Sequence, residues 1–85
     1  MAVDTALSFR FLAGEDERAG RCINLSHTGI FFETEHDLSE GQMLTVTIDT
    51  GNEKSQPVSA TVEIVRLEKT AHDFYRVAGR ILEFN

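Results

Sequence analysis

Alternation of apolar and polar residues runs through most of the chain and predicts β-strands. In the clearest case, Met43–Asp49, the residues Leu44, Val46 and Ile48 alternate with threonines and would face one side of a sheet. The other segments with strand signals are separated by short polar or glycine-containing turns: residues 6–13, 18–24, 29–34, 58–67 and 74–84. No helical period of useful length is present. The pattern therefore predicts an all-β fold, a small antiparallel barrel of six or seven strands.

Two places depart from simple alternation. In the strand that contains Ile64, apolar residues keep one parity up to that residue, whereas Val65 and Leu67 continue on the opposite parity. This change predicts a β-bulge or a strong bend near Ile64 and Val65. Phe31 and Phe32 are successive residues of one predicted strand, so only one ring can face the interior. The other is predicted to be exposed and available as an interface anchor.

Length and composition favour one folded domain over residues 1–85. The chain has 85 residues, 41% of them hydrophobic, and its single cysteine, Cys22, excludes an intrachain disulfide and a cysteine-based zinc cage. Cys22 is expected to be a buried strand residue. The net charge of −6 opposes binding of nucleic acid. Neither a signal peptide nor a run long enough to span a membrane is seen, so we expect a cytoplasmic protein without membrane insertion.

The residues that suggest catalysis or metal binding fit a solvated surface better. Ser26 and His27 are adjacent, and neighbouring side chains on an extended segment point apart, so they do not form a nucleophile–base pair. No nucleophile elbow or phosphate loop is present. The histidines at 27, 36 and 72 are scattered through polar, mostly acidic loops rather than spaced as metal ligands. We therefore expect no enzyme activity, no catalytic residue, no metal and no cofactor.

The stretch Asn24–Gly29 has the spacing N-x-S-x-x-G and lies between two predicted strands. Asn and Ser side chains bond nearby backbone groups, and glycine can adopt φ > 0, so this spacing suits a tight connection. The same residues would line a small polar cradle at the edge of a sheet. The stretch is therefore either a turn or half of a ligand site.

This spacing resembles the (D/N)-x-S-x-x-G signature of PilZ domains, small β-barrel modules of bacterial cyclic-di-GMP signalling. Two further stretches carry the resemblance. Leu38–Gln42 and the strand Leu44–Ile48 look like the family's l-x-x-G turn and the strand after it. Val77–Phe84 is similar to the closing v-G-v-r-F strand, with Ala78 where that pattern has glycine. The resemblance spans roughly residues 6–85 and implies a PilZ-like barrel.

The resemblance also implies a ligand and the residues that would contact it. In ligand-binding relatives, the motif's Asp or Asn, its serine and its glycine contact the bases and phosphates of cyclic-di-GMP. These roles would fall on Asn24, Ser26 and Gly29 here. Arg21 and Arg80 are candidate auxiliary residues of the same site.

One part of the family pattern is missing. Members that bind cyclic-di-GMP carry an R-x-x-x-R motif in a flexible segment before the first strand, whereas residues 1–5 hold no arginine and Arg10, Arg18 and Arg21 are not four apart. Arg18 and Arg21 should also point to opposite faces. Arginine–phosphate bonds contribute about 1.5–3 kcal/mol each, so losing two costs about 3–6 kcal/mol, or two to four decades of affinity. We expect weak or absent binding, which arginines from outside this chain would reverse.

Three interpretations of the chain remain. The favoured one is a PilZ-type regulatory module of cyclic-di-GMP signalling with a degenerate nucleotide site. The alternative is a ligand-independent adaptor of pilus, motility or exopolysaccharide machinery, in which the outward phenylalanine contacts a protein partner. The third is an unrelated barrel whose motif matches are accidental. A protein partner is expected in either of the first two.

Overall fold

The computed structural model describes residues 2–48, 58–70 and 73–85, and it confirms the predicted all-β barrel. The predicted loop at 50–57 and His72 lie outside the described residues. No helix long and apolar enough to cross a membrane occurs in the described part of the chain. The strands are β1 (Ala2–Phe11), β2 (Arg18–Leu25), β3 (Gly29–Thr34), β4 (Met43–Ile48), β5 (Val58–Lys69) and β6 (Tyr75–Phe84).

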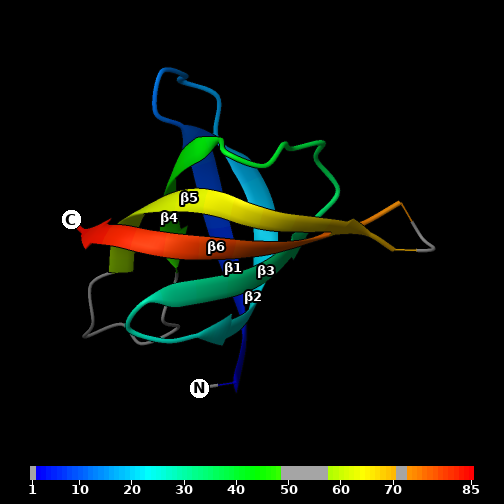
Figure 1. Cartoon of the computed structure of the whole chain (residues 1–85), viewed down its shortest axis with the longest axis horizontal. Coiled ribbons are helices and arrows are strands. Elements are labelled where there is room, and N and C mark those ends of the chain that lie inside the picture. Colours follow the sequence, from blue (N-terminus) through cyan, green and yellow to red (C-terminus); the bar gives the residue numbers. More distant parts are fainter. Residues whose placement is uncertain (1, 49–57, 71–72) are drawn as a thin grey trace.

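The six strands form a closed sheet in the order β1-β2-β3-β6-β5-β4, in which β4 pairs back onto β1. All neighbouring pairs are antiparallel. The last strand, β6, inserts between β3 and β5, as Figure 1 shows. Insertion of β6 therefore brings the β2–β3 turn beside a strand that is far away in the sequence.

Alternating side chains fill the barrel interior. Phe9 and Phe32 lie near its centre, with ring centroids 5.7 Å apart, and both are almost fully buried. Leu44, Val46 and Ile48 all face inward as predicted. The rest of the buried apolar core consists of Leu7, Cys22, Ile30, Leu38, Ala60, Val62, Ile64 and Val77. The hydrophobic alternation therefore identified the core face of β4 correctly.

Two strands have limits that differ from the predicted ones. The strand β1 spans Ala2–Phe11 instead of residues 6–13, because backbone pairing with β2, where Ala2 lies opposite Asn24, needs no apolar alternation. The strand β5 continues to Lys69, through residues that were predicted to form a turn. Its last residues pair with the start of β6. Backbone hydrogen bonding thus extends strands beyond the segments that side-chain patterns reveal.

The predicted bulge in β5 is confirmed. Ile64 lies opposite Gly79 and Arg66 lies opposite Ala78, so Val65 is an extra residue in the strand. The inward and outward positions therefore exchange parity after Ile64. Arg66, which would otherwise share the inward parity of Ile64, is exposed.

A further bulge, in β2, was not predicted. Cys22 lies opposite Phe32, whereas Asn24 lies opposite Phe31, which leaves Ile23 as the extra residue. Cys22 and Phe32 face the core, and Asn24 and Phe31 face outward. The bulge therefore turns the first residue of the N-x-S-x-x-G motif away from the barrel interior.

Cys22 is the buried strand residue that the sequence predicts. Burial raises the pKa of its thiol, and a hydrogen bond from the backbone of Asn24 opposes that rise with a smaller effect. The Sγ also lies 3.8 Å from the Asn24 carbonyl oxygen, to which the thiol can donate. The thiol therefore stays protonated at neutral pH and is shielded from reagents in solution.

Gly79 lies in the inward row of β6, between Ile30 of β3 and Ile64 of β5. A Cβ at this position would overlap the Val62 side chain and would lie 3.2 Å from Cγ2 of Ile30. Both neighbours belong to the buried core, so neither can move into solvent. Only a residue without a side chain fits here, and this is a packing requirement rather than a turn requirement.

We expect Gly79→Ala to lower the free energy of unfolding by about 1–3 kcal/mol, because the added methyl group overpacks the core. Denaturant unfolding measures the change. Gly14→Ala is the control, since its Cβ would make ordinary contacts, the shortest at 3.5 Å to Cβ of Phe11. In a Val62→Ala background the penalty should shrink, because space is opened beside Gly79. An equal penalty in both backgrounds would contradict this explanation.

Candidate functional site

Hydrogen bonds between Ser26 and Gly29 close the turn that joins β2 to β3. The Ser26 backbone N–H donates to the Gly29 carbonyl at 2.9 Å, and the Gly29 N–H donates to Ser26 Oγ at 3.1 Å. The hydroxyl also lies 3.3 Å from the Gly29 carbonyl oxygen, to which it can donate. His27 and Thr28 form the tip of the turn. Two residues of the motif therefore hold its shape through contacts with each other.

The turn is fixed to the closing strand. The Thr28 carbonyl accepts a hydrogen bond from the Ile81 N–H of β6 at 2.9 Å. Gly29 lies directly opposite Arg80, and a Cβ on Gly29 would lie 3.4 Å from the Gly79 carbonyl oxygen. This distance is at the limit of ordinary van der Waals contact, so the backbone of β6 leaves just enough room for a Cβ at this position. The turn and β6 thus form one unit, although more than fifty residues separate them in the sequence.

The strands β2, β3, β6 and β5 share one outward surface, which we call the β6 face. Residues opposite each other in an antiparallel sheet point to the same side, so strand register defines rows across this face. The first row, at the end near the turn, is Gly29, Arg80 and Glu63; the second is Asn24, Phe31, Ala78 and Arg66; the third is Arg21, Glu33, Arg76 and Glu68. Motif residues Asn24 and Gly29 therefore lie in adjacent rows of the same face.

Arg80, the arginine directly opposite Gly29, is held by an acidic neighbour. Its Nη2 lies 2.6 Å from Oε1 of Glu63 on β5, and the Arg80 side chain is 62% exposed. Both groups are on the outer surface, so the pair contributes only about 0.2–1 kcal/mol. Arg80 thus stands beside the motif, and Glu63 occupies part of its guanidinium.

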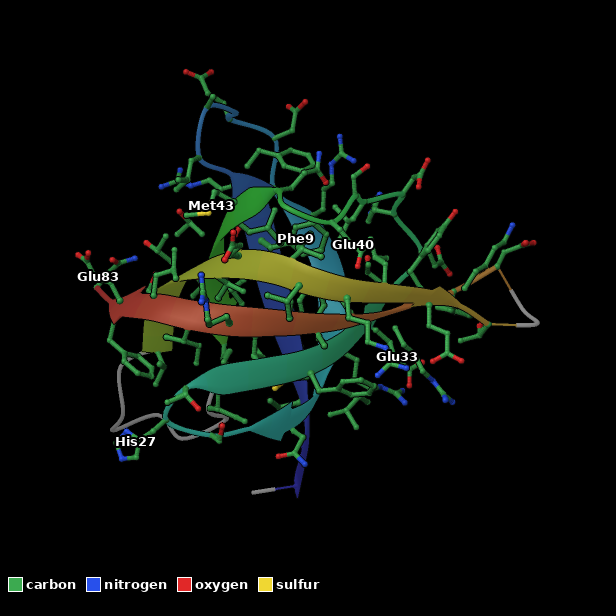
Figure 2. The ribbon with its side chains drawn as sticks, in the orientation of Figure 1. Phe9, His27, Glu33, Glu40, Met43 and Glu83 are labelled. Atoms are coloured by element: carbon green, nitrogen blue, oxygen red, sulfur yellow. The ribbon has the colours of Figure 1, made fainter. Side chains whose placement is uncertain are left out.

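Arg21 lies away from the turn. It pairs with Glu33, four residues beyond Gly29 on β3, which corresponds to about 13 Å along the strand. Figure 2 shows Glu33 and His27 at opposite ends of this strand pair. Arg21 instead lines a pocket of about 620 Å³ together with Glu33, Phe74 and Arg76. The structure therefore places Ser26, Gly29 and Arg80 at the turn, with Asn24 one row away, whereas Arg21 neighbours Asn24 on β2 but lies two rows from Gly29 and Arg80.

The face also carries charged residues that sequence reasoning did not single out, namely Glu63, Arg66 and Arg76. The bulge at Val65 was visible in the sequence and was the one available signal that Arg66 turns outward. Glu63 became relevant only through its register with Arg80, seventeen residues away. No local pattern reveals such a pair, because strand register has to be known first.

Among models of known protein families, that of the PilZ domain matches residues 3–84 of the chain. The match runs from β1 to the end of β6 and includes the turn and the whole β6 face. No curated protein matches the chain.

Replacing Ser26 by Ala should loosen the turn, because the Gly29 N–H loses its side-chain acceptor. A hydrogen bond of this kind contributes about 0.5–1.5 kcal/mol, so amide exchange at Gly29 should accelerate by about two- to tenfold. Ser26→Thr, which keeps the hydroxyl, is the matched control. Exchange measured by NMR that is unchanged in Ser26→Ala would show that the hydroxyl does not support the turn.

Proposed function

The chain belongs to the PilZ domain family, and we propose that it is a regulatory module of bacterial cyclic-di-GMP signalling whose nucleotide site is degenerate. PilZ domains are regulatory modules of the cyclic-di-GMP-binding type and not enzymes. A regulatory role follows from membership of the family. The weakness of the nucleotide site and a cytoplasmic location are our proposals.

The proposed base-contacting half of the site is the turn with Asn24. The Asn24 side chain is exposed on the β6 face, and an amide offers both a donor and an acceptor to a base edge. Ser26 and the Gly29 backbone would complete the contact. Because Ser26 Oγ already accepts from the Gly29 N–H, the hydroxyl would approach a ligand mainly through its remaining lone pair or its own proton.

The Arg80–Glu63 pair is the single observation that supports a weak phosphate half. A phosphate next to Gly29 would compete with the Glu63 carboxylate for the Arg80 guanidinium. Nη2 of Arg80 already lies 2.6 Å from Oε1 of Glu63. The resemblance to ligand-binding relatives puts an arginine clamp before the first strand, whereas the chain given carries no arginine before Arg10 and the start of β1 pairs with β2. Within this chain, the phosphates of the ligand would therefore contact Arg80, which already pairs with Glu63, and would lack the two arginines of the R-x-x-x-R motif.

A second candidate function is an adaptor that works without nucleotide. The observation that favours it is the pair Phe31 and Phe32: Phe32 is fully buried, whereas Phe31 is 36% exposed on the β6 face. An outward aromatic ring beside arginines is typical of anchors in protein interfaces. In this role, the barrel would present a surface to pilus, motility or exopolysaccharide machinery.

Calorimetric titration with cyclic-di-GMP tests the degenerate site. We expect a Kd above about 100 μM for the wild-type chain, because the two missing arginine contacts remove several kcal/mol. Glu63→Gln should tighten binding by about two- to fivefold, since it releases Arg80 from an exposed ion pair. Glu68→Gln is the matched control: it removes the same charge from the same strand and face without touching Arg80.

Two results would contradict the proposal. A Kd below about 10 μM for the wild-type chain would mean that the phosphates are well bound without the missing motif. Equal tightening by Glu63→Gln and Glu68→Gln would indicate a general charge effect, and the Arg80–Glu63 pair would then have no specific role.

A further inference from the structure

The β6 face contains a hollow over Ala78. This small residue lies in the middle strand of the face, with Phe31 beside it on β3 and Arg66 on β5. Together with Glu68 and Arg76 these side chains line a hollow of about 330 Å³. The hollow therefore has an apolar wall, a small apolar floor and a charged rim of two arginines and one glutamate.

The two arginines of the hollow are available to a ligand. Among residues 2–48, 58–70 and 73–85, neither Arg66 nor Arg76 forms an ion pair, in contrast to Arg80 with Glu63. Arg66 lies opposite Ala78, so no acidic residue of β6 faces it across the strand. A guanidinium that forms no ion pair keeps its donors available to an acidic group of a ligand.

The size of the hollow favours a side chain over a whole nucleotide. Small-molecule sites occupy about 300–1,000 Å³, and the hollow lies at the lower limit of this range. A dinucleotide with two bases needs considerably more space. One aromatic or large aliphatic side chain would fill the floor above Ala78 and pack against the exposed edge of Phe31.

We propose that the hollow over Ala78 binds an acidic segment of a partner protein, which inserts one aromatic or large aliphatic side chain between Phe31 and Arg66. A carboxylate next to that side chain pairs with Arg66 through charge-assisted hydrogen bonds. This inference rests on the adaptor role proposed above as the second candidate function, and it specifies the surface and the chemistry of the partner.

The charges around the hollow also give the segment a direction. Arg76 lies in a row between Glu33 and Glu68, so an acidic residue on that side meets two like charges. Arg66 has no acidic residue within its own row; its outward neighbours along β5 are Glu63, which pairs with Arg80, and Glu68. The acidic residue of the segment therefore lies toward Arg66, and a neutral or basic residue is favoured toward Glu68.

Selection of a random-peptide phage library on the wild-type barrel tests the proposal, followed by anisotropy titration of a labelled peptide with the selected sequence. We expect the selected peptides to combine Asp or Glu with Phe, Tyr or Leu. Ala78→Leu, which fills the hollow, and Arg66→Glu should each weaken binding by about tenfold or more. Arg10→Glu is the control, because it makes the same charge change on exposed β1, on the opposite side of the barrel.

Several outcomes would overturn the proposal. These are no enrichment, enrichment of basic or charge-neutral peptides, or a loss in Arg10→Glu equal to the loss in Arg66→Glu. Melting temperatures identify a variant that is merely unfolded, and Arg66→Glu still decides the matter if Ala78→Leu is unstable. If cyclic-di-GMP binds and Ala78→Leu abolishes that binding, the hollow belongs to the nucleotide. Failure of the peptide test leaves the separate nucleotide titration intact.

Discussion

The strict alternation of a closed barrel, and the bulges in β2 and β5 where one extra residue interrupts it, determine what the β6 face displays. In a six-stranded barrel every side chain faces either in or out, and the core tolerates almost no polar exceptions. The extra residues Ile23 and Val65 exchange the two parities in β2 and β5. Without them, Asn24 and Arg66 would share the inward parity of Cys22 and Ile64. Both would then be polar groups in the core, which is costly.

The bulges also explain why the two residues meet in one row. Asn24 and Arg66 lie on strands that do not touch, yet each lies in register with the same pair on the intervening strands, Phe31 and Ala78. The bulges in β2 and β5 leave the core side chains of both strands facing inward and turn one polar residue on each strand toward the surface. The β6 face is therefore a consequence of core packing as much as of its own charges.

The hydrophobic pattern was sufficient to predict the strands, the antiparallel barrel and the inward faces of β4 and β5, because core burial imposes a period of two. The Val65 bulge was predictable, since Val65 and Leu67 visibly change parity. The Ile23 bulge was not: Cys22, Ile23 and Leu25 are all apolar, so the sequence allows either parity. The motif residues were identified by resemblance, but their shared face and the Glu63–Arg80 pair depend on register, which no local signal contains.

Under the proposed function, the contacts that Ser26 and Arg80 already make explain how a ligand motif can persist with reduced binding capacity. Ser26 closes the β2–β3 turn, and Thr28 ties that turn to β6, so the motif supports the barrel whether or not a nucleotide binds. Arg80 likewise forms an ion pair with Glu63 whether or not a nucleotide binds. Each contact stabilises the free protein, and a ligand that breaks it must offset that loss.

A net charge of −6 adds a long-range penalty for any dianion, although salt screens it beyond about 10 Å. Under the proposals above, short-range contacts on the β6 face therefore decide which partner binds, and Arg66, across Ala78 from Phe31, offers them without first breaking an ion pair.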